Sequence, residues 1–410
     1  MAVIRLFRAV RPNEKVAHLV ASVPYDVVNR EEAAELAKGN PLSFLRVTRS
    51  EIEIRDLKDV YSPEVYQKAK SNFERLKAEA PLVQDTDPHL YIYKLTMGSH
   101  SQVGVAATFS VEDYDNDVIK KHEKTRKVKE DDRTNHIVTT EAQTGPVFLT
   151  YKAVAEIDKV VNETMKKSSP LYDFTSTDGI KHQVWIVPND HTNTIVNEIA
   201  KVKNLYIADG HHRAASASRA QKVKKEQNGN HKGDEEYNYF IAVLFPADQL
   251  KIMPYNRVVF DLKMNKDEFL SKIKNNFSFE ETGSPNPPSQ KTFCMYMDKK
   301  WYLLKPGENV KPGKAVGDKL DVSTLQNFLL HPILGIEDPR TDTNVDFIGG
   351  IRGTAELEKL VNSGKASVAF SMYPVSVDDL INISDVGETM PPKSTWFEPK
   401  LRDGLLVHVI

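Results

Sequence analysis

The sequence reads LYIADGHHRAA from Leu205 to Ala215. Its first four residues follow the pattern of a buried strand, and an alanine-rich helix pattern extends over Ala214–Val223. Asp209 and Gly210 stand at the turn between the two. Open α/β proteins bind their ligands at such turns, where a strand ends and a helix begins. The stretch therefore predicts an α/β fold with a binding site directly after this strand.

Strand and helix patterns alternate along much of the remaining chain, which favours mixed sheets. Apolar residues at helical spacing predict an amphipathic helix over Pro63–Ala78, and a Gly-then-Pro stop signal ends a second helix, Glu31–Lys38. Aromatic and β-branched runs predict strands at Val3–Phe7, Leu90–Leu95, Val103–Val111, Val184–Val187 and Ile241–Phe245. Thr292–Leu304 is expected to form a hairpin.

The length of 410 residues favours two domains, because a single hydrophobic core rarely serves more than about 300 residues. We place a change of domain near Phe260. Residues 1–260 then form the binding and catalytic domain, and residues 261–410 form a smaller α/β region. The tail of that region, 393–401, is expected to pack back near the site.

Composition excludes several classes of protein. The formal net charge is −2, so the strongly basic surface typical of nucleic-acid binders is absent overall. Cys294 is the single cysteine, which excludes a disulfide framework within the chain and a cysteine-rich zinc site. Arginines interrupt the apolar N-terminal run, and no stretch reaches the roughly 18 apolar residues of a membrane helix. We expect a cytoplasmic protein without a membrane partner.

The string Asp209-Gly210-His211-His212-Arg213 has the chemistry of a phosphate site. Backbone N–H groups and the dipole at a helix N-terminus favour an anion, and Gly210 lets a ligand approach the backbone closely. The fork of Arg213 matches phosphate, and the two histidines add donors that titrate near neutral pH. Asp209 would ligate a metal or orient a histidine. The structural alternative is that Asp209 caps the helix and the histidines pack nearby.

A second polar segment reads KKHEKTRKVKEDDR from Lys120 to Arg133. Its cations would screen the oxygens of a transferring phosphoryl group, and a carboxylate would accept the proton of an attacking hydroxyl. The cations include His122, Arg126 and Arg133, and Glu123 stands among them. The alternative is a solvated charged helix.

Two further segments are weaker signals. The turn-rich strings at 23–28 and 40–46 would bring Tyr25, Asp26 and Arg46 to a cleft, and their alternative role is loop packing. Near the chain end, Lys393–Leu401 carries the cations Lys393 and Lys400. Its alternative role is a clasp that packs Trp396 and Phe397 onto the body of the protein.

Other common catalytic motifs are missing. The sequence has no G-x-x-x-x-G-K-[ST] and no G-x-S-x-G, which excludes a P-loop enzyme and a nucleophile elbow. Gly349–Gly353 does not match the dinucleotide fingerprint G-x-G-x-x-G. His211 and His212 are adjacent, a poor spacing for two ligands of one zinc ion, and H-E-x-x-H is absent.

The string from Ala208 to Ala215, after its apolar strand, resembles the signature of ParB/sulfiredoxin-like proteins, which include free serine kinases. Other strings resemble one bacterial and archaeal branch, long labelled as of unknown function or SpoOJ/ParB-like, whose members are similar to pyrophosphate-dependent serine kinases. The resemblance spans nearly the whole chain. The branch-specific strings are Ser22–Val28, Asn40–Arg46, Lys121–Arg133, Thr144–Tyr151 and Lys393–Leu401.

This resemblance implies phosphoryl transfer from pyrophosphate to the hydroxyl of free L-serine, giving O-phosphoserine, a product that feeds cysteine synthesis. Magnesium is expected because such donors arrive as its complex, with Asp209 as its ligand. Glu123 is the first choice for the base, followed by Glu130 and Asp131. The implied catalytic residues are Glu123, Asp209 and His212. The residues implied to contact the phosphate are Gly210, His211, Arg213, His122, Arg126 and Arg133. Those implied to contact the substrate are Tyr25, Asp26, Arg46 and Lys393.

Three other functions remain open at the level of sequence. One is a kinase of the same fold that uses ATP or ADP. Another is a ParB-like DNA-binding partition protein, which requires a helix-turn-helix and a basic face. The third is a metal-dependent hydrolase that uses His211 and His212. The sequence favours small-molecule substrates over nucleic acid and leaves the oligomeric state open.

Overall fold

The computed structural model describes residues 2–79 and 82–410. The chain divides into two compact units, and each combines a sheet with helices. The first unit contains Met1–Lys121, Thr125–Leu250 and Pro399–Ile410, and the second contains His122–Lys124 and Lys251–Glu398. The mixed α/β class predicted from the sequence is confirmed. Along the chain the division falls after Leu250, whereas the sequence suggested a change near Phe260.

The first unit is built on a mixed sheet of nine described strands. Strand β11 lies between a parallel neighbour, β6, and an antiparallel one, β8, while β8 and β12 run parallel. The order across the sheet is β6 (Ile119–Lys120), β11 (Leu205–Asp209), β8 (Val147–Tyr151), β12 (Tyr239–Pro246), β5 (His100–Ser110), β4 (Tyr91–Met97), β10 (Lys181–Ile186) and β9 (Tyr172–Thr175), with β1 (Ile4–Arg5) on β5.

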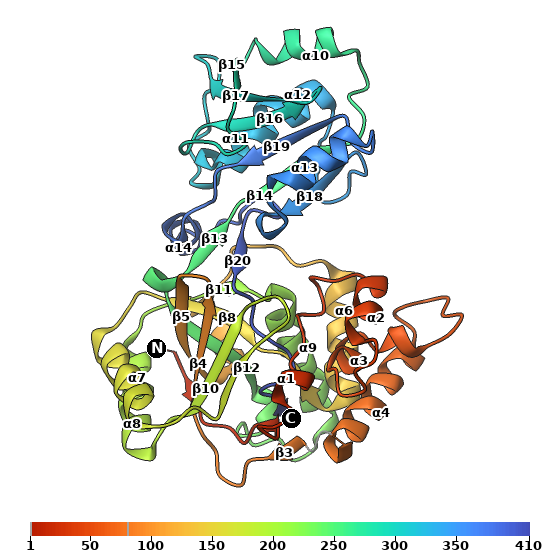
Figure 1. Cartoon of the computed structure of the whole chain (residues 1–410). Helices are drawn as coiled ribbons and strands as arrows, with labels where there is room; N and C mark the ends of the chain where they lie inside the picture. The colour runs from red at the N-terminus through yellow and green to blue at the C-terminus, as the bar shows by residue number, and fades with distance from the viewer. Residues whose placement is uncertain (1, 80–81) are drawn as a thin grey trace. The chain divides into compact units, whose positions relative to one another are not determined.

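Helices cover the sheet of the first unit. In Figure 1, α7 and α8 lie to its left, and α4, α6 and α9 lie to its right. Ile157, Ile195 and Ala214 join the strands in one hydrophobic core, which explains the amphipathic pattern of α7 and α8. The helices are α1 (Ala17–Val20), α2 (Arg30–Ala37), α3 (Leu45–Thr48), α4 (Pro63–Glu79), α5 (Val111–Asp115), α6 (Lys127–Thr140), α7 (Ala155–Lys167), α8 (Asn189–Lys201) and α9 (His211–Gln227).

The second unit has a sheet of six described strands, and the hairpin predicted over Thr292–Leu304 is confirmed within it. Its strands, in order, are β15 (Phe277–Thr282), β17 (Lys300–Pro306), β16 (Phe293–Met297), β19 (Val368–Met372), β14 (Tyr255–Val259) and β18 (Val345–Gly349), with β13 (Lys251–Met253) and β20 (Trp396–Glu398) as a separate pair. Its helices are α10 (Lys266–Ile273), α11 (Asp321–Leu325), α12 (His331–Leu334), α13 (Gly353–Asn362) and α14 (Val377–Asp385).

The last residues of the chain belong to the first unit. Strand β21 (His408–Val409) pairs antiparallel with β7 (Ala142–Gln143), and Ser22 forms an isolated bridge with Asp403. A second bridge joins Val407 to β2 (Val10–Pro12), which itself pairs with β3 (Leu82–Gln84). These pairings bring residues 400–403 to the turn after β11. Within the described residues, no helix combines the length and the apolar character needed to cross a membrane.

Candidate functional site

The turn between β11 and α9 is formed by a glycine in a left-handed conformation. Gly210 stands at the N-cap position with φ 89°, a left-handed conformation that favours glycine. As a glycine, Gly210 has no side chain that could cap the first turn of α9. The first N–H groups of a helix have no partner within the helix, so such an end attracts anions. Asp209 is not the cap, because its Oδ1 accepts from the N–H of Gly210 at 2.8 Å.

Lys400 supplies a cation at this turn. Its Nζ lies 2.6 Å from Oδ2 of Asp209, and the two residues are 191 positions apart in the sequence. Burial opposes ionisation of Asp209, but the ammonium of Lys400 outweighs it and lowers the pKa of Asp209 to about 2. The carboxylate is therefore charged at neutral pH. With 38 % of its side chain exposed, it stays accessible to a ligand.

The two histidines after Gly210 differ in their surroundings. His211 is buried, and the loss of solvation lowers its pKa to about 3, so its ring is neutral near pH 7. The expectation that both histidines titrate near neutral pH is therefore wrong for His211. His212 Nε2 accepts the backbone N–H of Arg126 at 3.1 Å. This bond places the start of α6 beside the start of α9, and the exposed Arg126 side chain emerges there.

Arg213 forms a bidentate ion pair with Asp403. Its Nη1 and Nη2 donate to Oδ1 and Oδ2 at 2.7 and 3.1 Å. Burial opposes the charge of Arg213, but the carboxylate of Asp403 outweighs it, so the pKa of Arg213 is raised. Gly145 lies so close that an added Cβ would stand 1.7 Å from Nη1. The phosphate contact predicted for Arg213 therefore competes with an internal carboxylate.

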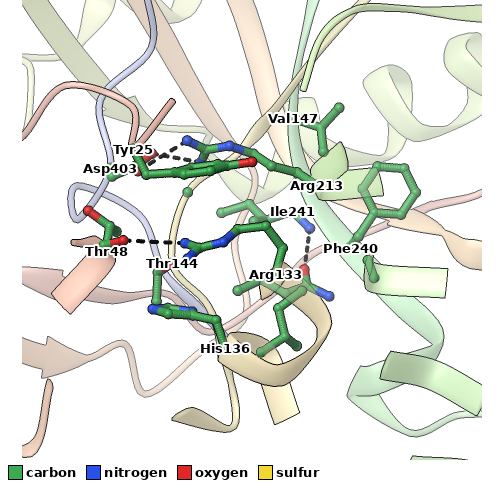
Figure 2. A pocket seen from close by; sticks show the side chains of 14 residues that line it. Tyr25, Thr48, Arg133, His136, Thr144, Val147, Arg213, Phe240, Ile241 and Asp403 are labelled. Carbon is green, nitrogen blue, oxygen red and sulfur yellow. Dashed lines mark hydrogen bonds and ion pairs between the residues drawn. The ribbon is translucent and has the colours of Figure 1, made fainter. Parts of the chain in front are cut away.

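Arg133 is also paired internally. It donates to both oxygens of Asp132 at 3.0 and 3.1 Å and to the carbonyl of Thr48 at 3.3 Å. Its guanidinium carbon lies 4.2 Å from the ring centre of Tyr25, and that of Arg213 lies 5.3 Å from the same centre. Figure 2 shows the two arginines with Tyr25 and, bonded to Arg213, Asp403. Tyr25 thus serves as a shared aromatic contact for both cations.

Two small cavities lie in this region. One of about 30 Å³ is lined by Tyr25, Arg133 and Arg213, among others, and a second of about 20 Å³ is lined by Asp26, Asp209 and Lys400, among others. Each has room for about one or two water molecules. Neither cavity has room for a molecule of substrate size.

The other predicted site residues lie elsewhere. Arg46 is engaged in its own surroundings, where it bonds to Glu53 and donates to the carbonyls of Asn40 and Ala37 at 3.0 and 2.8 Å. His122 and Glu123 belong to the second unit, as does Lys393, whose carbonyl accepts from the side chain of Arg257 at 3.2 Å. The structure therefore brings Tyr25, Asp26, Arg133 and the turn 209–213 together within one unit, but does not bring Arg46 into that group.

Sequence reasoning missed Arg402 and Asp403. Arg402 donates from Nε to Nε2 of His182 at 3.1 Å, so the proton of this neutral ring lies on Nδ1 and points to the hydroxyl of Tyr93, 2.9 Å away. These two residues could have been found from the sequence, because the polar stretch Arg402-Asp403-Gly404 stands between Leu401 and the apolar run that follows. A charged pair that interrupts a buried segment indicates internal partners.

The fold defines a mixed α/β protein with a cluster of charged side chains at a strand–helix junction. The profile of the family described as "Protein of unknown function (DUF1015)" matches residues 4–323, and the chain belongs to this family. A search of curated proteins finds no match.

Solved structures show a distant likeness. A conserved hypothetical protein from Pyrococcus furiosus is 12% identical with a TM-score of 0.36, over 75% of this chain and 95% of that one. A free serine kinase in complex with AMP gives the same identity and TM-score over 73% and 91%. C-terminally truncated SbnI from Staphylococcus aureus gives 12% and 0.31 over 73% and 85%. At this TM-score the likeness assigns neither a fold nor a function.

Proposed function

We propose that the protein is a small-molecule kinase that transfers a phosphoryl group from pyrophosphate to the hydroxyl of free L-serine, giving O-phosphoserine. The observation that carries this proposal is the turn after β11, where the Asp209–Lys400 pair adjoins the uncapped N-terminus of α9. The choice of donor and acceptor rests on the resemblance of the sequence to the pyrophosphate-dependent branch of serine kinases.

The turn suits a small, densely charged donor. Pyrophosphate has no base or sugar, so its site needs cations and N–H groups rather than an apolar pocket. Helix α9 offers N–H groups, and Lys400 and the exposed Arg126 offer cations near them. The left-handed Gly210 carries no side chain that would block a phosphate oxygen.

Magnesium enters this proposal together with the donor, as its complex. In Asp209 one carboxylate oxygen accepts from Gly210 and the other from the ammonium of Lys400, so the residues as arranged form no ready metal site. Direct coordination of Mg²⁺ by Asp209 requires Lys400 to release Oδ2.

Glu123 remains the proposed base. A base must accept a proton, and neighbouring cations make a carboxylate a weaker one. Asp131 pairs with Lys127 at 2.7 Å and with Arg219, and these contacts lower the pKa of Asp131. Glu130 accepts from the same Arg219 at 3.3 Å. These pairings count against Asp131 and Glu130 as the base.

The test is phosphoserine formation from L-serine and Mg²⁺, with pyrophosphate, ATP and ADP offered separately. Product with pyrophosphate alone supports the proposal. Product with a nucleotide alone would support the kinase reaction but would identify the nucleotide, rather than pyrophosphate, as the phosphoryl donor. Asp209→Asn should abolish turnover, whereas Asp190→Asn, which removes an exposed carboxylate of the same unit, should leave it unchanged. No product with any donor contradicts the proposal, and salt-sensitive DNA binding would then favour the partition protein.

A further inference from the structure

The second unit contains a cavity of about 730 Å³, far larger than those beside the β11–α9 turn. Small-molecule sites commonly have about 300–1,000 Å³. Four separate stretches form its walls: 123–124, 315–327, 337–340 and 387–392. All of them belong to the second unit, so this space is a feature of that unit by itself.

Hydrogen bonds connect the walls of this cavity. The N–H of Met390 donates to the carbonyl of His122 at 2.7 Å, which fixes the 387–392 stretch to the segment carrying Glu123. The N–H of Gly317 donates to Oε2 of Glu388 at 2.9 Å, and Ser323 Oγ donates to the carbonyl of Gly317 at 2.6 Å. The cavity is therefore a formed part of the fold, with its walls tied to one another across long sequence distances.

The net negative charge of the side chains that line this cavity favours a positively charged ligand. Asp338 and Arg340 form an ion pair at 2.6 Å and largely cancel each other. Lys124 is the one further cation among the lining residues. Against it stand the carboxylates of Asp318, Glu337 and Glu388, and Glu123 also lines the cavity. An excess of carboxylates on several walls attracts a ligand with more than one positive charge.

A second kind of surface lines the same space. Met390, Pro391 and Pro392 present apolar atoms on one wall, together with Ala315. A hydrated metal ion gains nothing from such a wall, whereas a methylene chain between two ammonium groups is desolvated against it. The combination of separated carboxylates with an apolar wall thus suits an organic cation with an aliphatic stem.

We propose that this cavity binds a linear polyamine, with its ammonium groups at the carboxylates and its methylene chain against Met390, Pro391 and Pro392. This inference stands apart from the proposed kinase reaction, because it concerns the cavity lining and is tested by direct binding. Because Glu123 also lines the cavity, a polyamine bound there would contact the residue proposed as the base.

The test is isothermal titration calorimetry of the full chain with spermidine at about 50 mM salt. We expect saturable binding that weakens at 0.5 M salt, where exposed charges are screened. Glu337→Gln and Asp318→Asn should each weaken binding about two- to fivefold, and the double variant about tenfold. Asparagine at 318 can still accept the N–H of Ala315, which Asp318 accepts at 3.2 Å. Glu308→Gln removes an exposed carboxylate that does not line the cavity and should bind like the unaltered protein.

Three results would overturn the proposal. One is the absence of saturable spermidine binding at low salt. Another is binding that the double variant leaves unchanged while circular dichroism shows an intact fold. The third is tighter binding of Mg²⁺ alone, lost in the same variants, because the cavity would then be a metal site. Each measurement is independent of phosphoserine formation, so failure here leaves the kinase proposal untouched.

Discussion

Arg213 and Asp403 are 190 positions apart in the sequence and form a buried ion pair with two parallel hydrogen bonds of 2.7 and 3.1 Å. Arg213 follows the turn that we propose as the donor site, and Asp403 lies on the returning chain end. The same chain end carries Lys400 to Asp209. The pair therefore ties the segment that supplies a site cation to the helix that supplies the anion site.

Loss of the Asp403 charge should destabilise the first unit strongly. Asp403→Asn leaves the guanidinium of Arg213 buried without its counterion, which costs about 3–5 kcal/mol. Urea unfolding measures this. The control Glu163→Gln removes an exposed partner of Lys167 and should leave the free energy of unfolding nearly unchanged. An Asp403→Asn variant within 1 kcal/mol of the unaltered protein would contradict the structural role of the pair.

A methyl group at Gly145 should disturb the same pair without altering its charges. The Cβ of Gly145→Ala would stand 1.7 Å from Nη1 of Arg213 and 2.0 Å from Oδ1 of Asp403. Both partners must move, so we expect a loss of at least about 3 kcal/mol in the free energy of unfolding. Gly229→Ala is the matched control, because its Cβ meets nothing within 4 Å. Equal stability of the two variants would show that the pair tolerates displacement.

Stability should fall as the pH drops below about 6.5. Burial lowers the pKa of His136 and His211 to about 3 and that of His182 to about 2. Below pH 6.5 these histidines take up protons in the unfolded chain but stay neutral in the folded chain. The free energy of unfolding therefore falls progressively down to about pH 3. Each histidine should cost about 1.4 kcal/mol at pH 5.5.

Urea unfolding between pH 7.5 and 5.5 tests this pH dependence. His182→Gln keeps an acceptor for Arg402 and a donor for Tyr93, but it cannot titrate in this range. In this variant the slope of the free energy of unfolding against pH should therefore be smaller, by the contribution of one proton. His18→Gln, at an exposed position, should leave the slope as it is. A slope that His182→Gln does not change would show that this ring is not neutral in the folded state.

Removal of Lys400 should shift the acid limb of the pH–rate profile. Lys400 lowers the pKa of Asp209 to about 2 against the effect of burial, so in Lys400→Met the pKa of this carboxyl rises by about 1–3 units. If ionised Asp209 is required, activity should begin to fall at a correspondingly higher pH. Kinetics across pH 4–8 measure this, with Lys225→Met as a control at an exposed lysine. An unmoved acid limb in an active variant would remove Asp209 from the mechanism.

The base can be identified by comparing three conservative variants. Glu123→Gln should lower kcat at least about a hundredfold with little change in donor affinity, because a general base acts in the chemical step. Glu130→Gln and Asp131→Asn remove partners of Arg219 and should change kcat much less. Steady-state kinetics with pyrophosphate as the varied substrate separate these outcomes. An unchanged kcat in Glu123→Gln would transfer the role to Glu130 or Asp131.

Local pattern was sufficient for several elements of the fold. The helix predicted over Pro63–Ala78 forms as α4, with Val65, Ala69, Phe73 and Leu76 on its buried face. The strand, turn and helix around Asp209 also appear as expected, because apolar periodicity and a glycine at the turn act over a few neighbouring residues. The charged segment that ends at Arg133 is partly solvated and partly buried, since α6 exposes Lys127 but buries Asp132.

The sequence alone thus determined the mixed α/β class and the position of a strand–turn–helix unit around Asp209. Only the tertiary structure decided which charges neutralise one another. The pairs Arg213–Asp403 and Lys400–Asp209 join residues about 190 positions apart, and no local pattern encodes such a partner. The same holds for His211, whose neutral state follows from burial. A side chain's charge and its availability to a ligand depend on its surroundings, and those surroundings exist only once the chain has folded.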